Sequence, residues 1–164
     1  MLKRTLILLL ALAATGCRTA LGTPGARASG SGPGSTVLNL EIEGSGYFAV
    51  QDGESTAYTR CGSIDEAAGG LLAIHGNPLS PQVSVPAGST GLAVSAAGLV
   101  TAQEGATSSN SIGSIDIFLF LNPGNLHALG GGLYEPTGNE VPLQTSPGDK
   151  ASGAGLLVAT DSAC

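Results

Sequence analysis

The sequence predicts an all-β protein: a single compact domain of short strands with at most one short helix, preceded by a signal peptide and a flexible tether. From Val37 onward, apolar and polar residues alternate in short segments, which is the period of a strand with one buried face. Each segment is bounded by Gly, Pro, Asn, Asp or Ser, the residues of tight turns. With 26 Gly and only 11% charged residues, long amphipathic helices are not expected.

Residues 1–16 have the pattern of a secretory signal peptide. Lys3 and Arg4 precede the apolar stretch Thr5–Thr15, which is too short for a membrane span and is followed by polar chain. The small residues before Cys17 resemble a bacterial lipobox, which implies cleavage before Cys17 and lipid attachment to its side chain. The alternative is an ordinary signal peptide cut near Gly16, with Cys17 incidental.

Residues 17–36 are expected to form the lipidated cysteine and a flexible tether, because they are rich in Gly, Ser, Ala, Thr and Pro and lack apolar periodicity. Loss of Lys3 and Arg4 with the signal would change the formal charge from −6 to −8. Such a chain does not suit nucleic acid or anionic lipid headgroups. Membrane attachment would come from acyl chains. Arg18 is not the acidic residue associated with retention in the inner membrane, so it favours the outer membrane. The domain would face the periplasm.

Residues 37–164 are long enough for one domain with a single core. A hairpin turn is predicted at Asp52–Gly53, a dipeptide favoured in tight β-turns. The expected strands cover residues 37–43, 46–50, 56–60, 71–74, 82–85, 91–95, 98–102 and 114–121.

One short helix is predicted in residues 123–129 (PGNLHAL), because three glycines follow it and provide a natural helix stop. The predicted core consists of the apolar residues that the strand pattern turns to one side. These are Leu40, Ile42, Phe48, Val50, Tyr58, Leu72, Leu79, Val94, Ile117, Leu119, Leu121, Leu129, Leu133 and Leu156.

The order of four segments resembles a known family. LNLEIEGSGYFAV (38–50), AYTRCGS (57–63) and GNPLSPQVSVPAG (76–88) are followed by the stretch from Ile115 to Asp149, IDIFLFLNPGNLHALGGGLYEPTGNEVPLQTSPGD. Together they resemble the β domain of the bacterial flagellar rod and hook proteins, with most similarity to the distal rod branch. The resemblance implies the complex β fold of that family over about residues 37–158.

The resemblance also assigns a fold-maintaining motif and marks departures from it. The motif residues are Gly44, Gly46, Phe48, Tyr58, Thr59, Arg60, Gly62, Pro78, Leu79, Asn122, Pro123, Leu133 and Tyr134. Cys61 stands where the family has a small polar residue, and Ile64 replaces its usual Phe. The long terminal helices of the family have no counterpart in this sequence, so polymerisation into a rod is not implied.

Catalytic and metal-binding patterns are not found. His75 lies in a turn-like segment and His127 in the predicted helix, without HExxH or CxxC spacing, so no metal site is expected. No G-x-S-x-G nucleophile motif occurs. The glycine-rich segments lack the Lys and Ser/Thr of a phosphate-binding loop. We therefore expect no catalytic residue, no cofactor and no small-molecule substrate.

Two cysteines remain if Cys17 is acylated. Cys61 and Cys164 would be an even pair in an oxidising compartment, and a disulfide would close a loop of about 100 residues, worth up to roughly 4–5 kcal/mol. The alternative is two independent thiols. Arg60, beside a strand end, is expected to pair with a carboxylate or to donate to backbone carbonyls, and its place in the motif favours a role in the fold.

These observations predict a non-enzymatic, lipid-anchored structural or accessory component of the flagellar basal body in the cell envelope. Its partners would be flagellar rod, hook or ring proteins, contacted through surfaces of the β domain. The alternative is a lipoprotein binding module that reuses this β domain outside motility.

Overall fold

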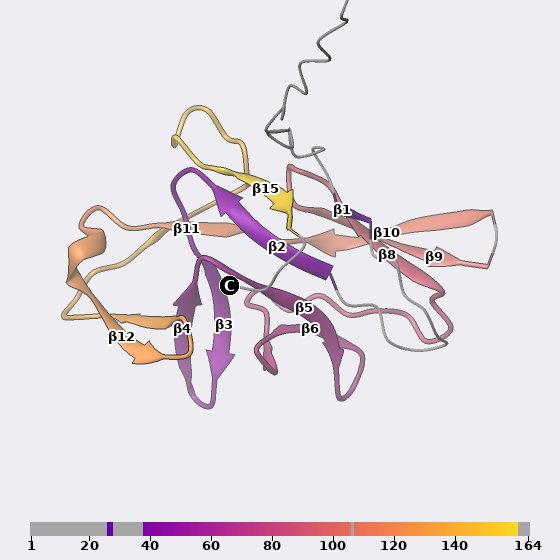
Figure 1. Ribbon diagram of the computed structural model, residues 1–164, viewed down its shortest axis with the longest axis horizontal. Coiled ribbons are helices and arrows are strands. Elements are labelled where there is room, and N and C mark those ends of the chain that lie inside the picture. The colour runs from indigo at the N-terminus through magenta and orange to yellow at the C-terminus, as the bar shows by residue number, and fades with distance from the viewer. Residues whose placement is uncertain (1–25, 28–37, 106, 161–164) are drawn as a thin grey trace, which may run out of the picture.

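The computed structural model describes residues 26–27, 38–105 and 107–160, and nearly all of its regular structure is antiparallel strand (Figure 1). Within these residues the one helical element is the 3₁₀ turn Pro123–Asn125. None of the described segments is a helix with the length and hydropathy needed to cross a membrane. The predicted all-β fold with at most one short helix is confirmed.

A five-stranded sheet in the order β15-β2-β5-β6-β7 forms the centre. Its strands are β2 (Leu38–Glu43), β5 (Cys61–Ala67), β6 (Leu71–Ile74), β7 (Asn77–Pro78) and β15 (Leu156–Ala159). In β2 the side chains of Leu38, Leu40 and Ile42 are buried, while Glu41 and Glu43 are exposed. This is the period-two alternation expected of a strand with one face on the core.

A second sheet in the order β12-β13-β4-β3 is built around the predicted hairpin. Its strands are β3 (Phe48–Asp52), β4 (Ser55–Thr59), β12 (Leu126–Gly130) and β13 (Leu133–Pro136). The hairpin turn follows Asp52, and Gly53 has φ +64°, a conformation that glycine adopts readily. One residue pair, Tyr134 and Tyr58, joins β13 to β4.

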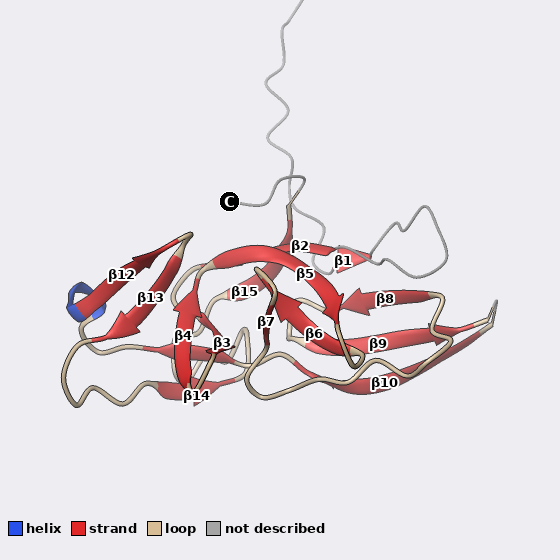
Figure 2. Ribbon diagram, turned by 90° about the horizontal axis from the view of Figure 1, so that it is seen from below, coloured by secondary structure: helices blue, strands red, loops and turns tan. Residues whose placement is uncertain are grey.

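The remaining strands form a four-stranded sheet and a ribbon. The sheet has the order β1-β8-β9-β10, with β1 (Ala26–Arg27), β8 (Gly91–Val94), β9 (Leu99–Glu104) and β10 (Ser108–Ser114); β11 (Ile117–Leu119) pairs with β14 (Leu143–Thr145). Within the predicted tether, Ala26 pairs with Val94 and Arg27 with Ala93. The β9–β10 hairpin projects at one end of the molecule (Figures 1 and 2).

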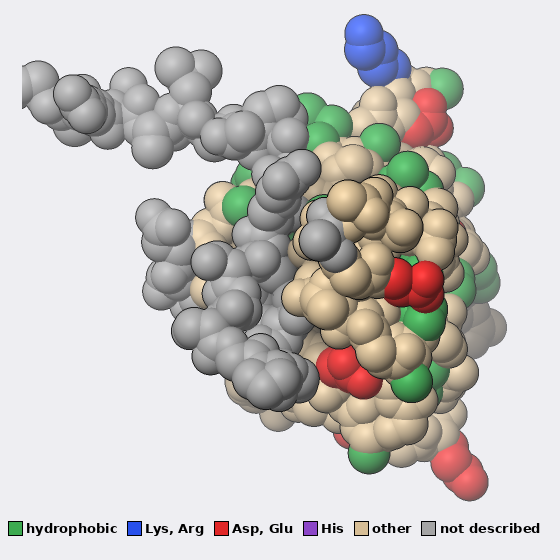
Figure 3. All heavy atoms as spheres, turned by 90° about the vertical axis from the view of Figure 1, so that its right-hand side faces the viewer, with side chains coloured by type: hydrophobic (Ala, Val, Ile, Leu, Met, Phe, Trp, Pro, Cys, Tyr) green, Lys and Arg blue, Asp and Glu red, His purple; other side chains and the backbone are tan. Residues whose placement is uncertain are grey.

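The face at this end is mainly polar. Figure 3 shows scattered acidic side chains there and no single gathering of hydrophobic ones. The strand β10 explains this, because most of its side chains are exposed and its sequence, SSNSIGS, is rich in serine. The hairpin therefore extends from the domain with a solvent-compatible surface.

One main core joins the central sheet to the β8–β9 pair. Its largest fully buried side chains include Phe48, Leu40, Ile64, Leu72, Ile74, Ile117 and Leu157. Of the predicted core residues, nine are buried: Leu40, Ile42, Phe48, Val50, Tyr58, Leu72, Leu79, Val94 and Ile117. Leu119 and Leu133 are half-buried.

The prediction of Leu121, Leu129 and Leu156 as core residues is wrong, because all three side chains are exposed. Leu121 comes after β11 has ended, and Leu129 lies in β12, where most side chains are exposed. Leu156 precedes the buried Leu157, so it points to the opposite face of β15.

Two predicted elements are also corrected. Residues 82–85 form no named strand, although the backbone N–H of Leu72 donates to the carbonyl of Val83 at 2.9 Å. The predicted helix over 123–129 is limited to Pro123–Asn125, because Leu126 is extended and begins β12. His127 therefore lies on a strand that pairs with β13. The pairing with β13 satisfies backbone groups that a longer helix would have satisfied internally.

The close packing of Gly62 gives a test of this core. A Cβ added at Gly62 would lie 2.4 Å from Cγ2 of Ile74 and 3.3 Å from Nε2 of His75. Gly62→Ala is expected to lower the free energy of unfolding by roughly 1–3 kcal/mol, because the buried side chain of Ile74 must move. Chemical denaturation measures this change. Gly124→Ala is the matched control, since a Cβ there meets nothing within 4 Å; equal unfolding midpoints for the two variants would contradict the packing argument.

Candidate functional site

The residues of the predicted motif concentrate where the chain passes from β2 to β3. Gly44 and Gly46 have φ +113° and +134°, and a Cβ on Gly46 would lie 2.8 Å from Cδ1 of Ile117. The carbonyl of Ser45 accepts a hydrogen bond from the N–H of Gly155 at 2.8 Å. The connection is therefore held between β11 on one side and the segment leading to β15 on the other, and only residues without a side chain fit at these two positions.

Arg60 fastens this connection from the turn between β4 and β5. Its Nη2 donates to the carbonyl of Ile42 at 3.3 Å and also to the carbonyl of Gly44. The guanidinium carbon lies 5.5 Å from the centre of the Tyr47 ring, within range of a cation–π interaction. Of the two kinds of contact expected for Arg60, the structure shows the one with backbone carbonyls.

Five of the six aromatic residues gather beside Arg60, and we call this group the aromatic cluster. Its members are Tyr47, Tyr58, Phe118, Phe120 and Tyr134. All four ring pairs are edge-on, with centroid distances from 4.8 Å to 6.1 Å. This geometry is the favoured one for aromatic rings. The cluster joins the β12-β13-β4-β3 sheet to β11.

Burial in this cluster affects the Tyr58 phenol. Tyr58 is only 7% exposed, and its desolvation raises the pKa of the phenol above the usual 10.0. Burial disfavours the charged phenolate, so the neutral form persists to higher pH. The side chain of Thr59, the next residue, is also buried. Tyr58 and Thr59 are thus packed in the interior, while the cation of Arg60 contacts the cluster at the Tyr47 ring.

The other motif residues lie in three further places. Phe48 is in the main core, and Leu133 packs against it. The N–H of Leu79 donates to the carbonyl of Leu72 at 2.9 Å, which holds the segment after Pro78 against β6. The N–H of Asn122, just before Pro123, donates to Oε1 of Glu140 at 2.8 Å. The structure thus brings part of the predicted motif together and distributes the rest along the domain.

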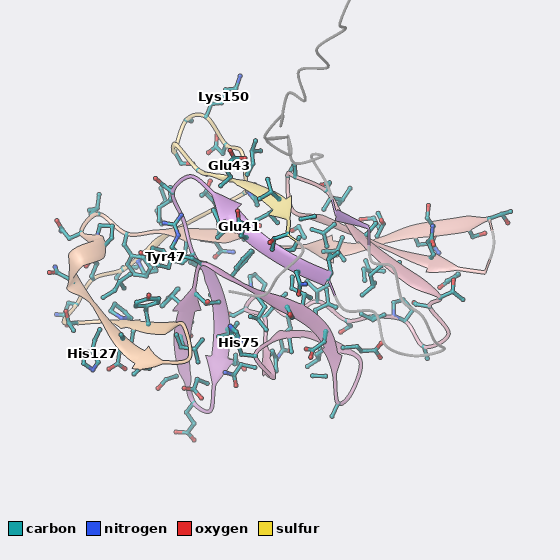
Figure 4. All side chains as sticks on the ribbon, in the orientation of Figure 1. Glu41, Glu43, Tyr47, His75, His127 and Lys150 are labelled. Atoms are coloured by element: carbon teal, nitrogen blue, oxygen red, sulfur yellow. The ribbon has the colours of Figure 1, made fainter. Side chains whose placement is uncertain are left out.

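The two histidines do not converge. Figure 4 shows His75 near β6 and His127 on the β12 strand, away from each other. Among the described residues no group of three His, Cys, Asp or Glu side chains is placed to hold a metal ion. Cys17 and Cys164 lie outside the described residues, so the predicted lipid attachment and disulfide remain predictions.

A groove on the surface is a feature that sequence reasoning missed. It has a volume of about 630 Å³; one wall contains Leu119, Phe120, Leu121, Val141, Pro142 and Leu143, and the other Ser45, Ser152 and Gly153. Leu121, Val141 and Leu143 are 93%, 85% and 58% exposed. The signal in the sequence was the run IFLFL (117–121), which is apolar on both faces of a strand. Such a run needs a cover on its second face.

Asp149 organises the loop beside the groove. Its carboxylate accepts hydrogen bonds from the N–H of Ala151 at 3.0 Å and from the hydroxyl of Thr145 at 3.2 Å. The hydroxyl of Ser152 donates to the Asp149 carbonyl at 3.2 Å. The bond from Ala151 and the other donors lower the pKa of the Asp149 carboxyl below its usual value of 3.8, because they stabilise the charged form.

These hydrogen bonds and ring contacts define a class of protein domain. It is a β scaffold in which polar and aromatic contacts hold the strands and the connections between them together. Residues 41–102, from within β2 to within β9, match the family model of the flagellar hook protein FlgE/F/G D1 domain. This β domain is similar to the flagellar rod and hook proteins, and the predicted resemblance to that family is confirmed.

Several similar curated proteins are flagellar basal-body rod proteins FlgG. That of Buchnera aphidicola subsp. Schizaphis graminum is 36% identical over 126 residues, which cover 73% of this chain and 46% of the relative. The Caulobacter vibrioides protein is 32% identical over 126 residues, with 74% and 47% covered. The Bacillus subtilis protein is 29% identical over 125 residues, with 72% and 47% covered. The chain spans about half the length of the curated relatives it matches.

Removal of the Arg60 contacts tests their contribution to the fold. Arg60→Ala is expected to lower the free energy of unfolding by about 1 kcal/mol, since the carbonyls it contacts lie partly at the surface. Arg60→Lys should recover only part of this, because an ammonium group cannot reproduce the planar, stacked guanidinium. Urea denaturation measures both, with Lys150→Ala, at an exposed loop position, as the control. The role of Arg60 would be disproved by an Arg60→Ala variant as stable as the control.

The lowered pKa of Asp149 predicts a pH dependence of stability. A carboxyl with a lowered pKa in the folded state stabilises the protein above its unfolded pKa, and this stabilisation is lost as the pH falls through the folded pKa. Asp149→Asn should therefore melt at a lower temperature than the wild type at neutral pH. The difference in melting temperature between Asp149→Asn and the wild type should disappear as the pH falls below about 4.

Thermal unfolding monitored by circular dichroism over this pH range measures the difference between the two proteins. Glu54→Gln, an exposed substitution next to the β3–β4 turn, provides the comparison for the loss of one negative charge. A gap between Asp149→Asn and the wild type that stays constant down to acidic pH would show that ionisation of Asp149 has no part in it.

Proposed function

We propose that this protein is a non-enzymatic, lipid-anchored structural or accessory component of the bacterial flagellar basal body. The observation that carries the proposal is the match of residues 41–102 to the FlgE/F/G D1 domain, together with relatives that are flagellar basal-body rod proteins. In this function the β domain acts through contacts with rod, hook or ring proteins in the cell envelope.

The contacts inside the domain support a structural role. The guanidinium of Arg60 is engaged by two backbone carbonyls and one ring. The carboxylate of Asp149 accepts hydrogen bonds from Ala151 in its own loop and from Thr145 at the end of β14. Both groups stabilise connections between strands, and this use of charged side chains is suited to a scaffold.

The lipid anchor is supported by the signal and the lipobox-like residues before Cys17. Ala26 pairs with β8, and the nine Cα-to-Cα steps from Cys17 to Ala26 can extend over at most about 30 Å. An anchor at Cys17 would therefore hold the domain close to the bilayer, on its periplasmic side. Arg18 favours the outer membrane for this anchor.

Two measurements on the native organism test the proposal. Affinity purification from envelope extracts is expected to enrich flagellar rod, hook or ring proteins, and deletion of the gene is expected to reduce swimming. Cys17→Ser should abolish the enrichment if the anchor brings the protein to the basal body. Normal swimming in the deletion strain, with no flagellar protein enriched, would reject the flagellar function and favour a lipoprotein binding module outside motility.

Mass spectrometry of the purified protein tests its covalent chemistry. The mature chain should begin at Cys17 and carry the additional mass of acyl chains, which Cys17→Ser should remove. Peptide mapping without reduction should also reveal a Cys61–Cys164 disulfide, which we propose ties the C-terminal residues to β5. Free thiols at both cysteines would refute the disulfide and leave the anchor unaffected.

A further inference from the structure

The apolar groove has a defined place in the fold. It lies between the β11–β14 ribbon, with the residues that flank it, and the loop that contains Ser152 and Gly153. The loop is fixed by the hydrogen bonds of Asp149 and by the bridge between Ser45 and Ala154. The groove therefore has two walls that are each held by hydrogen bonds to the rest of the domain.

The exposed side chains of the groove are aliphatic and adjacent. Leu121, Val141 and Leu143 all line it, and all three are among the few large hydrophobic residues that the described chain exposes. Contiguous apolar surface of this kind marks a binding surface more often than scattered apolar residues do. Of the described residues that line the groove, none is charged.

One edge of the ribbon is open beside the groove, where β14 begins at the lining residue Leu143. Phe118 exchanges both of its backbone hydrogen bonds with Tyr47, so β11 is occupied on its other side. In antiparallel pairing, Gln144, which lies opposite Phe118, then directs its backbone N–H and carbonyl away from β11. Within the described residues β14 pairs with β11 alone. An extended segment that continued from the groove past Leu143 along this edge of β14 could form hydrogen bonds with Gln144.

The surroundings of the groove are negatively charged. Asp116 accepts a hydrogen bond from the side chain of Gln144, and Glu140 directly precedes Val141. Asp149 accepts one from Thr145, the last residue of β14. The nearby cations are Lys150, which follows Asp149, and Arg60, which is engaged by the carbonyl of Gly44 next to the lining residue Ser45. An occupant with an apolar centre and a basic residue beside it would match both the lining and its surroundings.

We propose that this groove binds a short extended segment of another protein, apolar at its centre and flanked by Lys or Arg. The inference rests on the proposed function in protein–protein contact and names the surface that makes the contact. A second copy of this chain is a poorer match, because the chain carries a net charge of −6 and two copies repel each other.

Binding of two matched peptides tests the groove. Both are fluorescein-labelled octapeptides with alternating Val and Leu at the centre; one has Lys at each end and the other has Glu. Fluorescence anisotropy with the full-length chain should show saturable binding of the Lys-ended peptide, weakened by added salt. The Glu-ended peptide is expected to bind at least about tenfold more weakly.

Surface variants locate the binding. A double variant, Leu121→Ser with Val141→Ser, should weaken binding of the Lys-ended peptide by about tenfold or more, since it removes the exposed apolar side chains. Leu99→Ser is the matched control, because Leu99 is an exposed leucine on β9, outside the groove. Circular dichroism confirms that all variants fold.

The outcomes separate this proposal from its alternatives. Absence of saturable binding, equal binding of both peptides, or equal loss in the double variant and in Leu99→Ser would each overturn it. A dimer in sedimentation that the double variant abolishes would assign the groove to a second copy and also overturn it. Peptide binding together with normal swimming after gene deletion would reject the flagellar function. It would still support the groove as a peptide-binding surface.

Discussion

The domain depends on the way Arg60 holds the chain between β2 and β3. Its guanidinium donates to the carbonyls of Ile42 and Gly44 and lies over the ring of Tyr47. Arg60 itself lies between β4 and β5, which belong to different sheets. One side chain thus connects the central sheet, the hairpin sheet and the connection that joins them. A cation suits this place because several backbone carbonyls point toward it and a flat ring covers it.

Close approach of backbones is the second constraint, and it accounts for glycine at particular positions. A Cβ on Gly155 would lie 2.6 Å from the carbonyl oxygen of Glu43, and one on Gly98 would lie 2.2 Å from the carbonyl oxygen of Ile115. Backbone atoms cannot turn aside as a side chain can. These contacts bring β15 against the end of β2 and the β8–β9 turn against the start of the β11 segment. The short strands can therefore share one core although they belong to several sheets.

Periodicity predicted the elements that use one buried face. The alternation in β2 lies where the sequence pattern placed it, and the predicted turn forms one residue further on, at Gly53 and Glu54. Periodicity did not predict β12, because most side chains of this strand are exposed. The strand forms because β13 pairs with it. The same limit explains Leu121: an apolar residue at the end of an apolar run is expected inside, but Phe120 takes the buried place after β11 and Leu121 is exposed.

By itself, the sequence determined the all-β class, the family resemblance and a role of Arg60 in the fold, while the structure decided that its partners are backbone carbonyls. Each follows from local information: turn residues, alternation and the type of a single side chain. Only the tertiary structure decided that five aromatic rings meet beside Arg60 and that Leu121, Val141 and Leu143 line one groove. Residues about 20 positions apart come together there through the pairing of β11 with β14. Strand pairing between distant segments depends on the whole fold, which a local pattern does not contain.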